Sequence, residues 1–421
     1  MASDRITFAD VLRVREFRVL WLADAQSAAG DQLARVALSV LVFERTASAV
    51  LTALAYALTF LPALIGGVLL SGLADRLPRR RVLVGCDLVR VVLVGLMALP
   101  GMSLWLLGGL LILVVLVDAP FSAADSALVP DILDGEHYVV ATGLRTITNQ
   151  LSQLAGFAGG GIVIAAIGAR AGLAVDAATF ALSALLIMAG VHARPAPSSV
   201  ATEGHEHPPN TGMLSSFTGG VRLIWRNRKL RTLLAMAWLA GLYVVPEGVA
   251  APYADVLGGG ATAVGLLMAA MPAGTALGTY LFLRCVRAQA RPRWMGPLAA
   301  VAGVPLVLCA GTPGIAASVV LWAVSGLCFA YQVQVIAEFM RTVPDSQRGQ
   351  AVGIASSGLL AVQGLGLLLG GFVAGRWGTE WAVAGAGALG AVFALGLTSS
   401  WARASRDVEL ADPAPVTSAE S

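Results

Sequence analysis

Two long apolar segments flank the stretch Ser71-Gly-Leu-Ala-Asp-Arg-Leu-Pro-Arg-Arg-Arg81, and this arrangement decides the fold. The segments occupy roughly residues 47–70 and 81–100, and about 20 apolar residues are enough to cross a bilayer as a helix. Basic residues gather in loops that stay on the cytoplasmic side of a membrane. The stretch therefore predicts two transmembrane helices joined by a short cytoplasmic loop.

The composition of the whole chain supports this class. Of 421 residues, 57% are hydrophobic and 13% are charged, and the mean hydropathy is +0.78. Soluble domains carry about 25% charged residues, so this chain could not cover a water-facing surface and a soluble enzyme is excluded. The net charge of +3 comes from basic residues between apolar segments, which predicts membrane orientation and no nucleic-acid partner.

Segments of spanning length recur along the whole chain. They predict an all-α integral membrane protein with twelve transmembrane helices at about 17–43, 47–70, 81–100, 103–125, 138–167, 170–191, 230–254, 261–284, 294–310, 314–340, 349–375 and 379–401. A polar stretch rich in Pro and Ser divides them. We expect a six-helix half over 1–191, a flexible cytoplasmic linker over 192–228, a second six-helix half over 229–402 and a flexible cytoplasmic tail over 403–421.

An internal repeat supports the division into halves. An offset of 214 places Val129-Pro-Asp131 on Val343-Pro-Asp345, Gly156 on Gly370 and Asn149 on Gln363. Arginines concentrate in every second predicted loop. Only Arg45, Arg170 and Arg376 fall in the loops that would lie on the opposite side of the membrane. This pattern predicts a multi-pass protein with both termini in the cytoplasm, and we expect it in the cell membrane, plasma or inner.

The basic loop resembles the signature of the major facilitator superfamily, Gly-x-Leu-Ala-Asp-Arg-x-Gly-Arg-Arg, with Ser71 and Pro78 in place of the two glycines. Four further segments are similar to its drug and siderophore exporters, such as macrolide efflux and enterobactin export proteins: Phe17–Trp21, Gly30–Leu38, Ala127–Asp131 and Val175–Phe180. Gly156, Gly160 and Gly161 also match three of the four glycines of the antiporter signature Gly-x-x-x-Gly-Pro-x-x-Gly-Gly, in which Ser152 replaces the first glycine and Phe157 replaces the proline.

The resemblance implies that Asp75 closes a cytoplasmic gate by meeting a helix N-terminus of the other half, near Gly349. We assign Arg76, Arg79 and Arg80 to the same gating loop. The alternative is that the charges of this loop only set the topology. This alternative explains the arginines well and Asp75 poorly.

Charged and polar residues inside the spans form two stripes at helical spacing. Asp24, Asp31 and Arg35 lie on the first span, and Arg145, Asn149 and Gln153 lie on the fifth. Because a charge at membrane depth costs about 2.5 kcal/mol or more, both stripes indicate an aqueous route. Asp118 could join Asp24 and Arg145, as a structural ion network or as a proton relay, and the network is the favoured alternative. The same two readings hold for Asp31 with Arg35.

Glu247 lies in the seventh span without a basic residue to pair with. It predicts either a carboxyl that takes up protons or attracts a cation, or a carboxylate in a wet outer vestibule. Gln332 is a further cavity candidate, although helix packing explains it better. Asp125 and Glu338 are expected at the membrane interface.

The sequence lacks the residue patterns that nucleotide binding, metal binding and a disulfide framework require. Lys229 is the single lysine and is followed by Leu230, so no phosphate-binding loop exists and no nucleotide is expected to drive transport. His205 and His207 make too weak a pair for a metal site, and no cofactor is expected. Cys86, Cys285, Cys309 and Cys328 indicate packing rather than a disulfide framework.

The resemblance implies a secondary transporter that exports amphiphilic small molecules, such as antibiotics, drugs or siderophores, in exchange for protons. We expect it to act as a monomer in the lipid bilayer. One alternative keeps the fold for an importer or facilitator of a small metabolite. Another is a membrane receptor or scaffold that does not transport. An enzyme is disfavoured because no catalytic constellation is present.

Overall fold

The computed structural model describes residues 6–69, 76–194, 221–344 and 347–411, with backbone alone at 67–69 and 402–411. Helices and no strands make up these residues. Asp75, His205, His207 and Asp345 lie outside them, as does most of the expected linker. The expected tail is helical as far as Ala411.

The first half begins with a short helix, α1 (Phe8–Arg13), before its six transmembrane helices. These are α2 (Arg15–Thr46), α3 (Ala49–Ala57) with α4 (Leu61–Leu69), α6 (Arg79–Met97), α7 (Leu104–Ile132), α8 (Gly135–Ile167) and α9 (Ala169–Gly190). The second span, predicted as continuous, is thus divided between α3 and α4.

The second half follows the same order. Its first span is broken into α12 (Arg228–Trp238), α13 (Ala240–Tyr243), α14 (Val245–Gly248) and α15 (Ala250–Val256). The others are α16 (Ala261–Cys285), α17 (Arg291–Val301) with α18 (Gly303–Leu308), α19 (Ile315–Cys328) with α20 (Tyr331–Thr342), α21 (Arg348–Trp377) and α22 (Thr379–Ala411). Adding 214 to the bounds of α8 gives 349–381, close to those of α21.

Ten helices or helix groups in the described part of the chain are long and apolar enough to cross a membrane. The two that complete the twelve are α2 and α6, the first and third spans. Both carry charged residues in their interiors, among them Asp31 and Arg35 in α2 and Asp87 and Arg90 in α6. The chain therefore has the twelve predicted transmembrane helices, and two of them are unusually polar.

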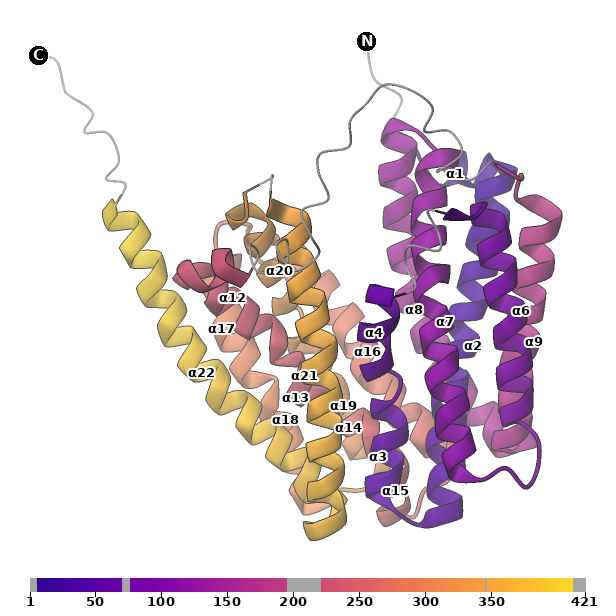
Figure 1. The fold of residues 1–421 in the computed structure, drawn as a ribbon. Coiled ribbons are helices and arrows are strands. Elements are labelled where there is room, and N and C mark those ends of the chain that lie inside the picture. The colour runs from indigo at the N-terminus through magenta and orange to yellow at the C-terminus, as the bar shows by residue number, and fades with distance from the viewer. Residues whose placement is uncertain (1–5, 70–75, 195–220, 345–346, 412–421) are drawn as a thin grey trace, which may run out of the picture.

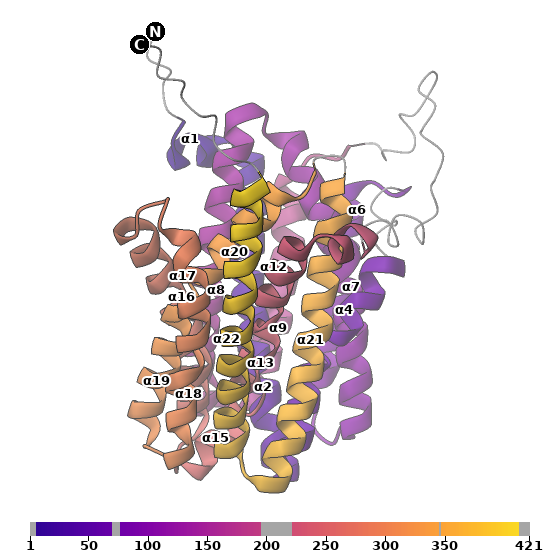
Figure 2. The same ribbon diagram turned by 90° about the vertical axis from the view of Figure 1, so that its left-hand side faces the viewer.

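The two halves lie side by side in the bundle (Figure 1). We call the end that carries α1 and the end of α22 the α1 face, and the other end the far face. In Figure 1 the ribbons of α3 and α21 meet near the far face, whereas α4 and α21 separate toward the α1 face. Figure 2 shows α22 between α21 on one side and α17 and α18 on the other.

Glycines allow the halves to touch toward the far face. A Cβ on Gly161 of α8 would lie 2.8 Å from the Cα of Gly265 on α16, so these two backbones are in direct contact. Gly371 of α21 likewise faces Ala53 of α3, and Gly364 faces Leu61 of α4. The absence of side chains brings the helices of the two halves close together there.

Candidate functional site

A cavity of about 140 Å³ lies between the two halves. Gln150 and Gln153 line it from α8, Glu247 from α14 and Gln363 from α21. The hydroxyl of Tyr56, on α3 of the first half, donates a hydrogen bond of 2.7 Å to Oε2 of Glu247. A bond between a titratable carboxyl and the opposite half thus stands beside the cavity.

The break in the seventh span explains the position of Glu247. Pro246 and Pro252 lack the backbone N–H that an uninterrupted helix needs, and the span divides into short helices around them. In membrane proteins, non-helical backbone is tolerated where it is buried in protein or lines a cavity. The break therefore places Glu247 at the cavity wall, where the sequence had left two alternatives open.

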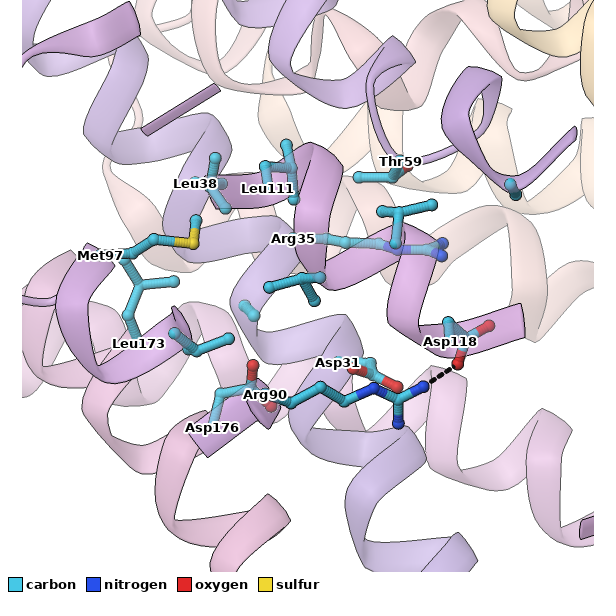
Figure 3. Close-up of a pocket in the computed structure, with 15 residues that line it drawn as sticks. Asp31, Arg35, Leu38, Thr59, Arg90, Met97, Leu111, Asp118, Leu173 and Asp176 are labelled. Carbon is cyan, nitrogen blue, oxygen red and sulfur yellow. Dashed lines mark hydrogen bonds and ion pairs between the residues drawn. The ribbon is translucent and has the colours of Figure 1, made fainter. Parts of the chain in front are cut away.

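A second cavity, of about 150 Å³, lies within the first half and is lined by Asp31, Arg35, Arg90, Asp118 and Asp176 among others. In Figure 3 the guanidinium of Arg90 reaches between Asp31 and Asp118. It forms an ion pair with Asp118 and lies 3.6 Å from Oδ1 of Asp87. Arg90 is 3% exposed and also lies over the rings of Phe121 and Phe180. It is the centre of this charge cluster.

Asp87, Arg90 and Tyr56 were not among the candidates from the sequence. Asp87 is fully buried, and within the described structure neither of its carboxyl oxygens has a hydrogen-bond partner. Asp87 and Arg90 could have been found, because they lie three residues apart inside an apolar segment. Tyr56 gives no such signal, because a tyrosine is an ordinary residue in an apolar helix.

Arg35 is near the polar groups of both cavities. It lines the cavity of the first half, lies over the ring of Phe60 and is near enough to the Tyr56–Glu247 pair to favour a negative charge there. Among the described residues it forms no ion pair with Asp31, although the two are one helical turn apart. Asp31 thus has two guanidiniums nearby, those of Arg90 and Arg35, which line the same cavity (Figure 3).

A separate ion cluster forms around Arg145. Its guanidinium pairs with Asp125 and lies 3.2 Å from Oδ2 of Asp24. The inclusion of Asp118 in this cluster was wrong, because Asp118 pairs with Arg90 instead. The side chain of Asp125 is 6% exposed within the protein, and its placement at the membrane interface stays a prediction. Helix rotation decides these partners, and depth along a helix does not reveal it.

The polar residues expected near these clusters fall into three places. Asn149 lines a pocket with Asp24 and Arg145, and Gln153 lines the cavity between the halves. Gln332 donates a hydrogen bond of 3.1 Å to the carbonyl of Ala237, so it joins α20 to α12. Glu338 is buried and accepts hydrogen bonds from Gln334 and Arg341 near the end of α20, and its placement at the membrane interface stays a prediction.

The described part of the basic loop is held by its own half. Arg79 donates to the carbonyl of Ala127 at 2.6 Å and pairs with Asp131, while Arg80 donates to the carbonyl of Met188. Arg76 is exposed. The two inner arginines therefore fasten the start of α6 to α7 and α9.

Glu16, at the start of α2 and ahead of the predicted span, forms a cluster at the α1 face. Arg194 donates to both carboxyl oxygens at 2.5 and 3.0 Å, and the backbone N–H of His192 donates at 3.0 Å. Burial raises the pKa of Glu16, but the hydrogen bonds from Arg194 and His192 outweigh burial and lower it from 4.5 to about 2. The cluster ties the residues after α9 to α2.

The three antiporter-like glycines serve two interfaces. A Cβ on Gly156 would meet Gln32, and one on Gly160 would meet Leu33, so both glycines bring α8 against α2 within the first half. Gly161 instead faces α16 of the second half. The motif thus contributes to the packing of a half and to the contact between halves.

Twelve membrane helices in two halves, with a polar cavity between them, define a transporter architecture. The family model of the Major Facilitator Superfamily matches residues 20–336 and 247–415, and the chain belongs to this superfamily. It is therefore a multi-pass membrane protein of a family that transports small molecules.

Relatives and solved structures agree with this family. The chain is 28% identical over 375 residues to the multidrug efflux pump Tap of Mycobacterium tuberculosis, covering 84% of this chain and 85% of the pump. The Tap pump of Mycolicibacterium fortuitum is 25% identical over 368 residues, covering 84% of this chain and 88% of that pump. The nucleoside transporter NupG is 14% identical with a TM-score of 0.66, covering 93% of this chain and 99% of its own.

A bacterial homologue of the lysosomal transporter Spinster, in an inward-facing occupied conformation, gives a TM-score of 0.68 at 15% identity. It covers 93% of this chain and 96% of its own. At these identities the solved structures establish the fold, and the substrates that they carry say nothing of this chain.

Proposed function

We propose that this transporter exports amphiphilic small molecules, of the antibiotic, drug or siderophore kind, in exchange for protons. It does so as a monomer that alternates between a state open at the α1 face and a state open at the far face. The α1 face is the cytoplasmic one in this proposal, since the predicted loops on that side hold most of the arginines. Both termini then lie in the cytoplasm. The relation to the Tap efflux pumps supports the outward direction.

The observation that carries the proposal is the hydrogen bond between Tyr56 and Glu247. A hydrogen bond to an ionised group stabilises by about 1.5–3 kcal/mol, roughly twice as much as one between neutral groups. Proton uptake by Glu247 removes the charge and weakens the link between the halves beside the cavity. Protonation and the closure of the far face are then coupled through one side chain.

The charge cluster of the first half supports a second place for protons. Four carboxyls, those of Asp31, Asp87, Asp118 and Asp176, surround Arg90, and Arg35 is the other cation of that cavity. Ionisation of all four would leave excess negative charge within the bundle, where Asp87 and Asp176 are buried, and this is strongly unfavourable. We propose that at least one carboxyl of this cluster holds a proton and exchanges it during transport.

The test is cellular accumulation of macrolides, cationic dyes and siderophores, with and without the protein, before and after a protonophore. We expect the protein to lower accumulation of some probes and the protonophore to reverse the effect. In Glu247→Gln, the lowering of accumulation that the protonophore reverses should be lost, while the variant remains in the membrane. Accumulation that the protein raises would show an importer. Unchanged accumulation of every probe, with the protein present in the membrane, would favour a receptor or scaffold.

A further inference from the structure

Two pockets toward the α1 face occupy related places in the two halves. The polar pocket, of about 260 Å³, is lined by Asp24, Ser126, Tyr138, Thr142, Arg145 and Asn149 among others. The apolar pocket, of about 190 Å³, is lined by residues that include Ala237, Val335, Met340, Val352, Ser356 and Leu359. Each pocket is enclosed by the first, fourth and fifth helices of its half.

The repeat relates individual lining residues of the two pockets. The offset of 214 places Ser126 on Met340, Tyr138 on Val352, Thr142 on Ser356 and Arg145 on Leu359. Three of these four pairs exchange a polar or charged side chain for an apolar one. Equivalent places in the two halves have therefore acquired opposite chemistry.

Both pockets lie along the route to the cavity between the halves. On α8, Thr142, Arg145 and Asn149 follow one another at three- and four-residue spacing, and the next residue of that stripe, Gln153, lines the cavity. The same spacing on α21 leads from Leu359 to Gln363, which lines the cavity as well. Residues at this spacing share one face of a helix, so each pocket borders the path from the α1 face to the cavity.

The polar pocket suits a cation with hydrogen-bonding groups. The guanidinium of Arg145 is shared by Asp24 of the pocket wall and by the buried Asp125 behind it, which leaves one negative charge uncompensated when both acids are ionised. Arg145 contacts Oδ2 of Asp24, and within the described residues Oδ1 accepts no hydrogen bond, while the side chain is 37% exposed. A carboxylate oxygen is thus available to a ligand, with hydroxyl and amide groups from Thr142 and Asn149 beside it.

We propose that the two pockets hold opposite ends of one amphiphilic amine. The protonated amine lies against Asp24 in the polar pocket, and the apolar body lies against Val352 and Leu359 in the apolar pocket. This inference rests on the proposed function for its substrate and adds the charge of the polar end and the residues that receive each end.

The test is equilibrium binding to the whole protein in lipid nanodiscs, with hexylamine, octylamine and decylamine and the three matching alcohols as probes. Free probe is measured by dialysis. Binding of the amines should tighten by about fourfold for each added methylene that is buried. Asp24→Asn should remove the preference for amine over alcohol and keep the dependence on chain length. Leu359→Asn should halve or abolish that dependence and keep the preference for the amine.

Thr142→Val with Asn149→Leu replaces Asp24→Asn if that variant does not fold, and it should likewise reduce the preference for the amine. Leu360→Asn is the control, because Leu360 is also half-buried on α21 and is not among the residues that line either pocket. It should change neither quantity. The inference would be overturned if one variant lost both the preference for the amine and the dependence on chain length, or if neither variant changed either quantity. It would also be overturned if the wild-type protein bound no amine.

Proton-driven export of decylamine from the same protein in vesicles separates this inference from the proposed function. If Asp24→Asn and Leu359→Asn each change a different property of binding but export does not depend on the proton gradient, the two-pocket inference is supported and proton coupling is rejected. Proton-driven export without separate effects on binding would reject the two pockets alone.

Discussion

At the scale of single residues, the charges within the membrane are organised around two arginines. Arg90 gathers acids from α2, α6, α7 and α9, and Arg145 gathers acids from α2 and α7. The sequence reveals that the acids exist, because each interrupts an apolar segment. Which acid meets which arginine depends on the rotation of every helix about its axis, and spacing along one helix cannot supply that. For this reason Asp118 was placed in the wrong cluster.

Removal of Arg90 should destabilise the protein strongly. Arg90→Leu leaves Asp87 buried without a cation nearby, and uncompensated buried charge costs about 3–5 kcal/mol. Asp118→Asn should cost less, because Arg90 keeps the carboxyls of Asp87 and Asp31 nearby. Thermal unfolding in detergent measures both. If Arg90→Leu melts at or above the temperature of Asp118→Asn, the central role of Arg90 is wrong.

Glu16 should make the stability of the folded protein depend on pH in the acidic range. Its pKa falls from 4.5 in the unfolded chain to about 2 in the folded one, so its contribution is complete above pH 4.5 and is lost as the pH falls toward 2. The contribution is at most about 3 kcal/mol. Melting temperatures between pH 7 and pH 3 should show Glu16→Gln less stable at pH 7, with a smaller loss on acidification. Parallel curves for variant and wild type would contradict this.

At the scale of helices, the extents of the spans follow from the sequence to within a few residues in most cases. α8 was expected at 138–167 and is found at Gly135–Ile167. The breaks in the seventh span were not foreseen, although Pro246 and Pro252 were visible. Proline is tolerated in membrane helices when neighbouring groups satisfy the freed carbonyls, so a proline alone does not predict a break. The surrounding helices decide the outcome.

Two glycines on α8 offer a matched test of the contact between halves. Gly161→Ala places a methyl group 2.8 Å from the backbone of α16, whereas a Cβ on Gly159 would meet nothing within 4 Å. Overpacking of this kind costs about 1–3 kcal/mol, so closure of the far face should weaken by roughly fivefold or more. Transport and labelling of cysteines introduced at the far face measure this. Gly159→Ala should behave like wild type, and equal effects of both substitutions would refute the role of Gly161.

At the scale of the whole molecule, two halves with one fold differ in chemistry. The first half holds the clusters around Arg90 and Arg145, and the related pocket of the second half is apolar. The sequence predicts two halves from the repeat and predicts polar residues in the first. It does not predict that the second half supplies Glu247 to a partner in the first, because contacts between halves involve residues far apart in the chain.

The bond between Tyr56 and Glu247 should set the balance between the two open states. Tyr56→Phe removes a hydrogen bond worth about 1.5–3 kcal/mol and leaves the carboxyl in place. The state open at the far face should then gain about tenfold or more in population, seen as faster labelling of far-face cysteines in vesicles. Labelling should depend little on pH in Tyr56→Phe and in Glu247→Gln, because the first substitution removes the bond that protonation weakens and the second removes the group that takes up the proton. Identical labelling of Tyr56→Phe and wild type would show that the bond does not hold the halves together.

The polarity of α2 and α6 also bears on how the chain is made. The other ten spans are apolar enough to leave the translocon for lipid one after another, whereas charged residues oppose that step for these two. Asp87 of the same helix lies beside Arg90 from the start, but the ion pair of Arg90 with Asp118 can form only once α7 has been synthesised. The third span should therefore wait beside the translocon until the fourth emerges, and the two should enter the bilayer together. The ion pair of the finished transporter is then also a checkpoint of its biosynthesis.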